Sequence, residues 1–268
     1  MTKPRSLALV CAGPISRNGI GRLPNLAEQL GPVKSGTLQR ASRAVNSIGG
    51  GTPVSGYRDL ESSRTILINV PDQQLRVIVA ELAAGVCWKH RVAVLCNSTL
   101  DSSELAPLEA LGAAVGSFDT IAGFDGQRYL IEGSGPAIRE MRALLQQGLT
   151  RAIEIRRGAK KHYLVGVDFV STLLTSTLVA SVKNLRKAGM PLREAHSIAA
   201  KLAEKSVKDY LKAGVAGSAA APGTELEALA DGLEFANPGL IQYMRSPKTA
   251  SRPIPAIHLD GEKPLITS

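Results

Sequence analysis

The chain has 268 residues, of which 44% are hydrophobic and 21% are charged, and its net charge is +9. This composition excludes a disordered or low-complexity protein, and the length allows one large or two modest domains. Three cysteines without a C-x-x-C pair and four histidines without ligand spacing predict no metal site. They favour a reduced, cytoplasmic protein whose cysteines are small core residues.

The basic charge is compatible with a nucleic acid, an acidic partner or an anionic small ligand. The densest basic segment, residues 151–161, has no aromatic residues that could stack on bases, and no zinc-finger or basic-zipper pattern occurs, so we expect no nucleic-acid partner. The first apolar run ends at Gly13-Pro14, too early for a signal peptide. No segment reaches the roughly 18 uncharged apolar residues of a membrane span, so we expect no membrane association.

An apolar run at residues 7–12 predicts a buried parallel strand that ends in a glycine turn. Such a turn lets backbone amides approach a phosphate, as in a dinucleotide-binding βαβ unit. The G-x-G-x-x-G fingerprint is incomplete, because its three slots hold Cys11, Gly13 and Ser16. A strand-loop-helix unit without a cofactor is therefore the alternative. If a dinucleotide binds, the expected contacts of this turn are Ala12, Gly13, Pro14, Ile15 and Ser16.

The next elements are a helix, a short strand and a basic helix. Residues 23–30 predict the first helix, which Gly31-Pro32 ends, residues 33–36 the strand, and residues 38–48 the second helix. In a dinucleotide-binding sheet, an acid after the second strand binds the ribose of NAD, whereas arginine accommodates the extra phosphate of NADP. The sequence offers no acid there but Ser35, Thr37, Arg40 and Arg43, which favours NADP over a merely solvated helix face.

Two further buried strands are predicted at residues 64–70 and 91–96. Asp72 is expected to cap the helix over residues 73–84, and Asp101 or Ser102 the helix after the second strand. Open α/β sheets bind ligands beyond the carboxyl ends of their strands, so both strand ends predict one crevice, with plain cap and turn chemistry as the alternative. The expected cofactor contacts are Val70, Pro71 and Asp72, and the expected substrate contacts are Asn97, Ser98 and Thr99.

The alternation of strands and helices predicts a doubly wound parallel Rossmann-type sheet followed by a smaller all-helical C-terminal domain. The last sheet elements are strands at 114–119, 129–133 and 152–155 and a helix at 136–147. Helices follow at 162–185, which we interpret as a buried central helix, at 191–213 and at 225–233. The expected domains are residues 1–156, residues 157–246 and an extended proline-containing tail at residues 247–268.

This order of elements resembles the 6-phosphogluconate dehydrogenase-like superfamily, which includes β-hydroxyacid dehydrogenases and pyrroline-carboxylate reductases. Four segments look like the Rossmann-like proteins with an uncharacterised helical C-terminal domain, generally described as NADP-dependent oxidoreductases. They are Val70-Pro71-Asp72, residues 98–108, residues 112–117 and Ile131-Glu132-Gly133, and the resemblance covers about residues 6 to 215. It implies NADP as cofactor, a small-molecule substrate and a homodimer.

The resemblance also suggests roles for residues near the long helix. The β-hydroxyacid dehydrogenases place a catalytic lysine at the start of this helix, where Lys160 and Lys161 stand, but their asparagine one turn later is absent. The His-Pro of the second family is Asp119-Thr120, and its later asparagine falls on Thr172. The resemblance therefore implies Lys161 as the acid, Ser98 as a further catalytic residue, and Asp119 and Thr172 as substrate contacts.

Asp168 interrupts an otherwise apolar stretch of the same helix. A buried carboxylate needs a partner or a solvated cleft, and Asp168 shares a helix face with Lys161 because seven residues nearly complete two turns. Our hypothesis is that Asp168 is catalytic; a structural salt bridge is the alternative.

The sequence thus predicts an NADP-dependent oxidoreductase that transfers hydride to or from a small keto or hydroxy acid or an imine, with degenerate cofactor and catalytic motifs. The alternative is a catalytically inactive dinucleotide-binding or protein-interaction module.

Overall fold

A computed structural model describes residues 7–12, 19–96, 99–121, 123–124, 128–146 and 150–217. The chain divides into two compact units, Met1–Gly166 and Val167–Ser268. The sheet belongs to the first unit, whereas the sequence predicts a sheet domain that ends at residue 156. The predicted helix at residues 225–233 and the predicted tail at 247–268 lie outside the described residues.

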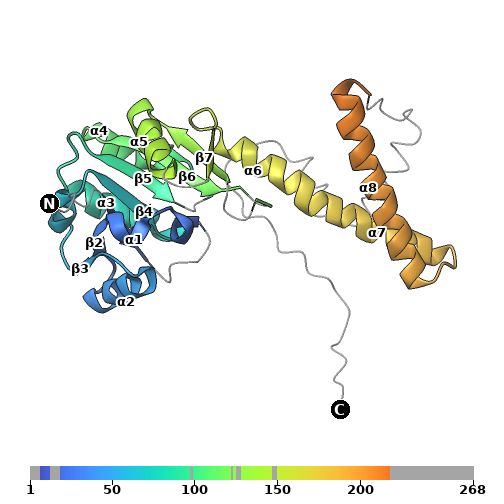
Figure 1. Cartoon of the computed structure of the whole chain (residues 1–268), viewed down its shortest axis with the longest axis horizontal. Coiled ribbons are helices and arrows are strands. Elements are labelled where there is room, and N and C mark those ends of the chain that lie inside the picture. The colour runs from blue at the N-terminus through green and yellow to red at the C-terminus, as the bar shows by residue number, and fades with distance from the viewer. Residues whose placement is uncertain are drawn as a thin grey trace, which may run out of the picture. The chain divides into compact units, whose positions relative to one another are not determined.

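The first unit is built on an eight-stranded sheet with the order β3-β2-β1-β4-β5-β6-β7-β8 (Figure 1). All neighbouring strands are parallel except β6 and β7, so the predicted doubly wound α/β fold is confirmed. The strands are β1 (Leu7–Cys11), β2 (Leu30–Lys34), β3 (Thr52–Val54), β4 (Thr65–Asn69), β5 (Val92–Cys96), β6 (Ala114–Thr120), β7 (Arg128–Gly133) and β8 (Arg151–Glu154).

Helices cover both faces of this sheet and create two hydrophobic cores. One core joins the sheet to α1 (Leu26–Gln29), α2 (Leu38–Ile48) and α5 (Gly135–Leu145), and the other joins it to α3 (Asp72–Gly85) and α4 (Ala106–Ala110). Every residue of β1 and β5 is buried, because these central strands are covered on both sides. Three short 3₁₀ segments complete the unit: η1 (Gly19–Arg22), η2 (Arg58–Ser62) and η3 (Ser102–Leu105).

Strand β7 is the exception to the parallel arrangement. It pairs antiparallel with β6, from Gly116 opposite Gly133 to Thr120 opposite Tyr129. The connection between the two strands spans only residues 121–127, too few for the crossover helix that a parallel pair requires. The short connection therefore determines the direction of β7.

The prediction for residues 23–36 is wrong at its boundaries. The first helix, α1, has four residues, and Gly31-Pro32 lies inside β2 instead of ending a helix. The β1–β2 ladder is irregular between Leu7, opposite Leu30, and Leu9, opposite Val33. Pro32 falls in this interruption, where its missing N–H is tolerated. The edge strand β3 was also missed, because three residues give no usable periodicity.

One helix runs continuously from Lys160 to Lys187. It consists of α6 (Lys160–Asp168), a π-helical segment (Phe169–Leu173) and α7 (Leu174–Lys187). Within the second unit, α7 packs against α8 (Leu192–Gly217) after a turn at Gly189. Ala195 and Ala199 of α8 are buried.

The prediction that this long helix is buried is wrong. Phe169 and Val170 are 50% and 69% exposed, and Leu174 and Val179 are exposed as well. A run of apolar residues reveals that a helix needs a covering surface, but it does not reveal which surface supplies it. The helix is also long and apolar enough to cross a membrane. A single helix of this kind is weak evidence for a membrane span, since helices of soluble proteins pass the same test.

Candidate functional site

The carboxyl ends of β1 and β4 form the point where the strand order reverses, and ligands of open α/β sheets bind beside such a point. The Ala12 N–H donates to the Asn69 carbonyl at 3.2 Å, which extends the pairing of the two strands by one residue. Gly13, Pro14, Ile15 and Ser16, the predicted phosphate turn, lie outside the described residues. Their role as cofactor contacts stays a prediction.

The turn after β2 carries the basic residues that the sequence assigns to NADP. Thr37 caps α2, since its hydroxyl accepts from the Arg40 N–H at 3.2 Å. The Arg40 guanidinium lies over this turn, 3.7 Å from the position that a Cβ on Gly36 would take. Arg43 follows one helical turn later and both arginines are exposed, whereas Ser35 is buried. Two exposed guanidinium groups beside the end of β2 fit an additional phosphate group.

The ends of β4 and β5 are joined by Asp72 and Thr99, which the sequence places in one crevice. The Asp72 Oδ2 atom accepts from the Thr99 N–H at 3.3 Å and also from the Thr99 hydroxyl. The predicted cap position of Asp72 is wrong, because Pro71 holds the cap position of α3 and Asp72 is the first residue of the helix. Val70 is buried and Pro71 is exposed, while Asn97 and Ser98 lie outside the described residues.

A buried lysine and an aspartate lie close to each other at the same edge of the sheet. The Lys160 Nζ atom, at the start of α6, lies 3.7 Å from Oδ2 of Asp119 on β6. Lys160 is 1% exposed, and its Nζ has no hydrogen-bond partner within the described part of the chain. Burial raises the pKa of Asp119 above its usual value, although the Lys160 charge opposes this shift; the charge of Asp72 adds to it. Asp72, Asp119 and Lys160 therefore share one edge of the sheet.

The structure distinguishes two adjacent lysines that the resemblance leaves equivalent. Lys161 is exposed, because one residue along a helix turns the side chain by about 100°. Lys160 shares its helix face with Leu164 and Val167, at i+4 and i+7, and this apolar pattern is the sequence signal that could have identified it.

Asp168 and Thr172 belong to the second unit, where Thr172 is half-buried. Asp168 is exposed, so the expectation of a buried carboxylate is wrong; the described residues of its own unit leave this part of the helix uncovered, as they do at Phe169 and Val170. The assignment of Asp168, Thr172 and Lys161 to a site stays a prediction.

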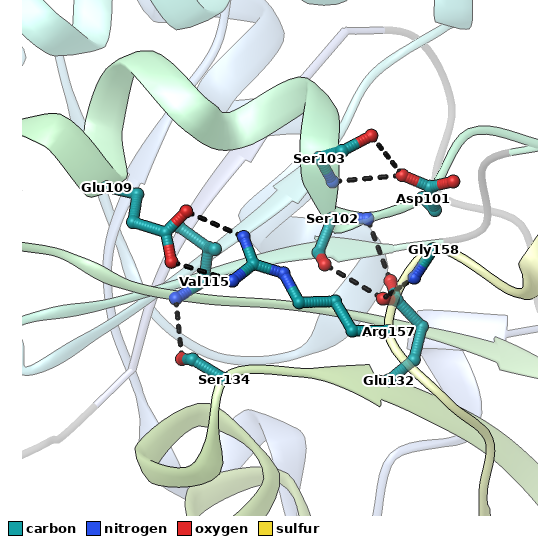
Figure 2. A network of polar contacts seen from close by, with 9 residues as sticks. All are labelled: Asp101, Ser102, Ser103, Glu109, Val115, Glu132, Ser134, Arg157 and Gly158. Carbon is teal, nitrogen blue, oxygen red and sulfur yellow. Dashed lines mark hydrogen bonds and ion pairs between the residues drawn. The ribbon is translucent and has the colours of Figure 1, made fainter.

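Glu132 is a further buried acid that the sequence did not single out as functional. It lies on β7 and is 0% exposed, and Figure 2 shows its contacts with Ser102 and Gly158.

Among the cysteines, Cys11 and Cys96 are buried core residues as expected, but Cys87 is exposed, because it follows the end of α3. The described residues contain no group of three or more potential metal ligands.

No protein-family model and no curated protein matches the sequence. Solved structures do match. An imine reductase from Aspergillus terreus in complex with NADPH4 is 14% identical, with a TM-score of 0.62 and 87% of each chain covered. An imine reductase from Myxococcus stipitatus in complex with NADP+ is 15% identical, with a TM-score of 0.59 over 89% of this chain and 91% of the other. A reductive aminase from Aspergillus terreus in complex with NADPH and ethyl levulinate is 15% identical, with a TM-score of 0.56 over 88% of this chain and 87% of the other.

At these identities the likeness concerns the fold. It extends over nearly nine tenths of this chain, from the Rossmann-type sheet into the helical region. The protein therefore shares its fold with NADP-binding imine reductases, as the resemblance to the 6-phosphogluconate dehydrogenase-like superfamily implies.

Proposed function

We propose that this protein is an NADP-dependent oxidoreductase that reduces a small imine or keto acid, or oxidises the corresponding amine or hydroxy acid. The observation that carries the proposal is the buried Lys160 ammonium, which has no hydrogen-bond partner among the described residues and lies 3.7 Å from Asp119. A buried donor without a partner is costly, and such groups are frequent where a ligand supplies the missing acceptor.

Lys160 is the proposed proton donor, in place of Lys161. The reduced cofactor, when bound, supplies a hydride to the substrate carbon. Lys160 would donate a proton to the substrate nitrogen or oxygen, which gains the electron pair of the former double bond. Asp119 lies 3.7 Å from the resulting neutral amine, which regains a proton before the next turnover.

Arg40 and Arg43 would hold the extra phosphate that distinguishes NADP from NAD. Both are exposed at the end of β2, and residues 34–43 contain no acid that could bind the ribose of NAD. Val70 and Pro71 would line the cofactor site beyond β4, and Thr99 would contact the substrate. These roles are supported by the position of each residue at the carboxyl edge of the sheet.

Replacing both arginines is expected to remove the preference for the phosphorylated cofactor. In Arg40→Ala/Arg43→Ala the dissociation constant of NADPH should rise by at least about tenfold, since two charge-assisted contacts to phosphate are lost, while that of NADH changes little. Fluorescence titration of the purified protein measures both constants. The control is Arg76→Ala/Arg139→Ala, which removes the same charge from exposed positions on α3 and α5. An equal loss of NADPH affinity in the control would refute the assignment.

A measurement of turnover then distinguishes an active oxidoreductase from a catalytically inactive dinucleotide-binding protein. NADPH oxidation with a panel of cyclic imines and small keto acids, followed by absorbance, supports the proposal. Binding of NADPH without turnover of any member of the panel supports the catalytically inactive dinucleotide-binding protein instead.

We further propose that the chain forms a cytoplasmic homodimer through the apolar helix at residues 160–187. Phe169, Val170 and Val179 are exposed in the single chain, and this supports a partner subunit that covers them. Sedimentation should give twice the chain mass of 28.2 kDa, and Val170→Glu should give a monomer, because a charge in an apolar interface is costly. Val77→Glu is the control, since Val77 is 60% exposed on α3. A wild-type monomer would contradict the proposal.

A further inference from the structure

Glu132 has an unusually complete set of contacts for a buried acid. Its Oε1 accepts from the Ser102 N–H at 2.7 Å and from the Ser117 hydroxyl. Its Oε2 accepts from the Ser102 hydroxyl at 2.8 Å and from the Gly158 N–H at 3.3 Å (Figure 2). Four donors satisfy a carboxylate that is 0% exposed, so the charge is stable without access to water.

Two of these donors belong to residues that are close in sequence to the residues of the proposed site. Ser117 lies two residues before Asp119 on β6, and alternate residues of a strand point to the same face. Gly158 lies two residues before Lys160, in the turn that leads into α6. One carboxylate therefore connects the two backbone segments that carry the Lys160–Asp119 pair.

The turn before α6 has other restraints as well, and within the turn the Ala159 N–H donates to the Arg156 carbonyl at 3.0 Å. The Ile155 N–H donates to the Ile131 carbonyl at 3.0 Å, and Arg157 forms a bidentate pair with Glu109 at 2.9 and 2.6 Å (Figure 2). The Arg157–Glu109 pair is 40% and 36% exposed, and exposed ion pairs contribute little. The part-buried bond from Gly158 therefore ties this turn to a carboxylate that is itself 0% exposed.

We propose that Glu132 is a positioning residue for the proposed reaction: by holding Ser117 and Gly158, it sets the Lys160 ammonium in its buried position opposite Asp119. The functional meaning rests on the role proposed above for Lys160. The structural link between Glu132 and the burial of Lys160 is independent of that role, and it can be tested without cofactor or substrate.

If Glu132 contributes only to general stability, its replacement should expose other side chains than if Glu132 positions Lys160. A loosened sheet would expose Cys11 and Cys96, which are buried in β1 and β5, together with Lys160. A released turn would expose Lys160 alone. The exposed neighbours Lys161 and Cys87 act as internal references for the two labelling reactions.

The test is the rate of lysine acetylation by N-hydroxysuccinimidyl acetate in the folded full-length chain, located by fragment-ion mass spectrometry. In Glu132→Gln, acetylation of Lys160 should rise at least about tenfold relative to wild type, because donor groups that faced a charge now face an amide. Acetylation of Lys161 should stay within about twofold, and a thiol reagent should still modify Cys87 alone. The control Glu109→Gln removes the exposed pair of the same turn and should leave Lys160 protected.

Two results would overturn the proposal: Lys160 staying protected in folded Glu132→Gln, or Lys160 becoming reactive only together with Cys11 and Cys96. If Glu132→Gln does not yield folded protein, Gly158→Ala supplies the test. Gly158 has φ +74° and open space around a Cβ, so alanine strains this turn without a clash and leaves Glu132 intact. Selective acetylation of Lys160 is expected there too, and its absence would count equally against the proposal.

Discussion

Lys160→Met should lower the turnover of any imine or keto acid that the protein reduces by about 10²- to 10⁴-fold, the usual contribution of a general acid. The affinity for NADPH should change little, because the proposed phosphate contacts of Arg40 and Arg43 lie at the end of β2, on another element. Steady-state rates of NADPH oxidation and fluorescence titration of NADPH measure the two effects separately.

Stability discriminates between a catalytic and a structural lysine. The Lys160 ammonium is buried and has no hydrogen bond within the described residues, so the ion pair with Asp119 compensates its burial only in part. Removing one member of a buried ion pair is costly where the other charge stays buried, but the Asp119 side chain is 24% exposed and remains hydrated when methionine replaces Lys160. The thermal midpoint of Lys160→Met should therefore equal or exceed that of wild type while activity is lost. A clearly lower midpoint would indicate a structural role instead.

Lys161→Met is the matched control, because it makes the same chemical change at the adjacent, exposed position. Its turnover should stay within about threefold of wild type, as expected for a surface charge remote from the reacting atoms. If Lys161→Met abolishes turnover and Lys160→Met does not, the assignment from the resemblance is right and the proposal for Lys160 is wrong.

The central strands could be predicted from the sequence because their environment leaves a local pattern. Residues 7–11, 65–69 and 92–96 are covered on both faces, so each reads as a continuous apolar run. That these strands end at one edge of the sheet follows from the parallel arrangement alone, and the bond between Asp72 and Thr99 confirms that the ends of β4 and β5 meet. Strand β2 departs from this logic, because its neighbours tolerate a glycine and a proline that locally indicate a helix end.

The site residues beyond the strand ends depend on contacts that no local pattern contains. The donors to Glu132 come from residues 102, 117 and 158, which only the fold brings together. The choice between Lys160 and Lys161 is intermediate, because the apolar residues at positions 164 and 167 indicate the helix face of Lys160 but not that Asp119 of β6 lies opposite it. The exposure of the helix at residues 160–187 likewise depends on what covers it, whereas the sequence reports only that it is apolar.

Gly133→Ala should lower the free energy of unfolding by more than about 3 kcal/mol. Gly133 ends β7 opposite Gly116, where the antiparallel strands come close together. A Cβ on Gly133 would lie 2.4 Å from the Val115 carbonyl oxygen and 2.5 Å from the Gly116 Cα. Both are backbone atoms of β6, so no side chain can move aside. The φ of +144° adds strain that any residue with a Cβ would feel.

Gly49→Ala separates the clash from the strain. Gly49 ends α2 with φ +80°, and a Cβ there would have nothing within 4 Å, so only the left-handed conformation is penalised, at about 1 kcal/mol. Urea unfolding followed by circular dichroism measures both losses. Because the Ser134 N–H and Oγ also bond to Val115, displacement at Gly133 should weaken the whole end of the β6–β7 pair. Equal losses in the two variants would mean that β7 can move away from β6, and that this pair does not hold Glu132 as tightly as its four hydrogen bonds imply.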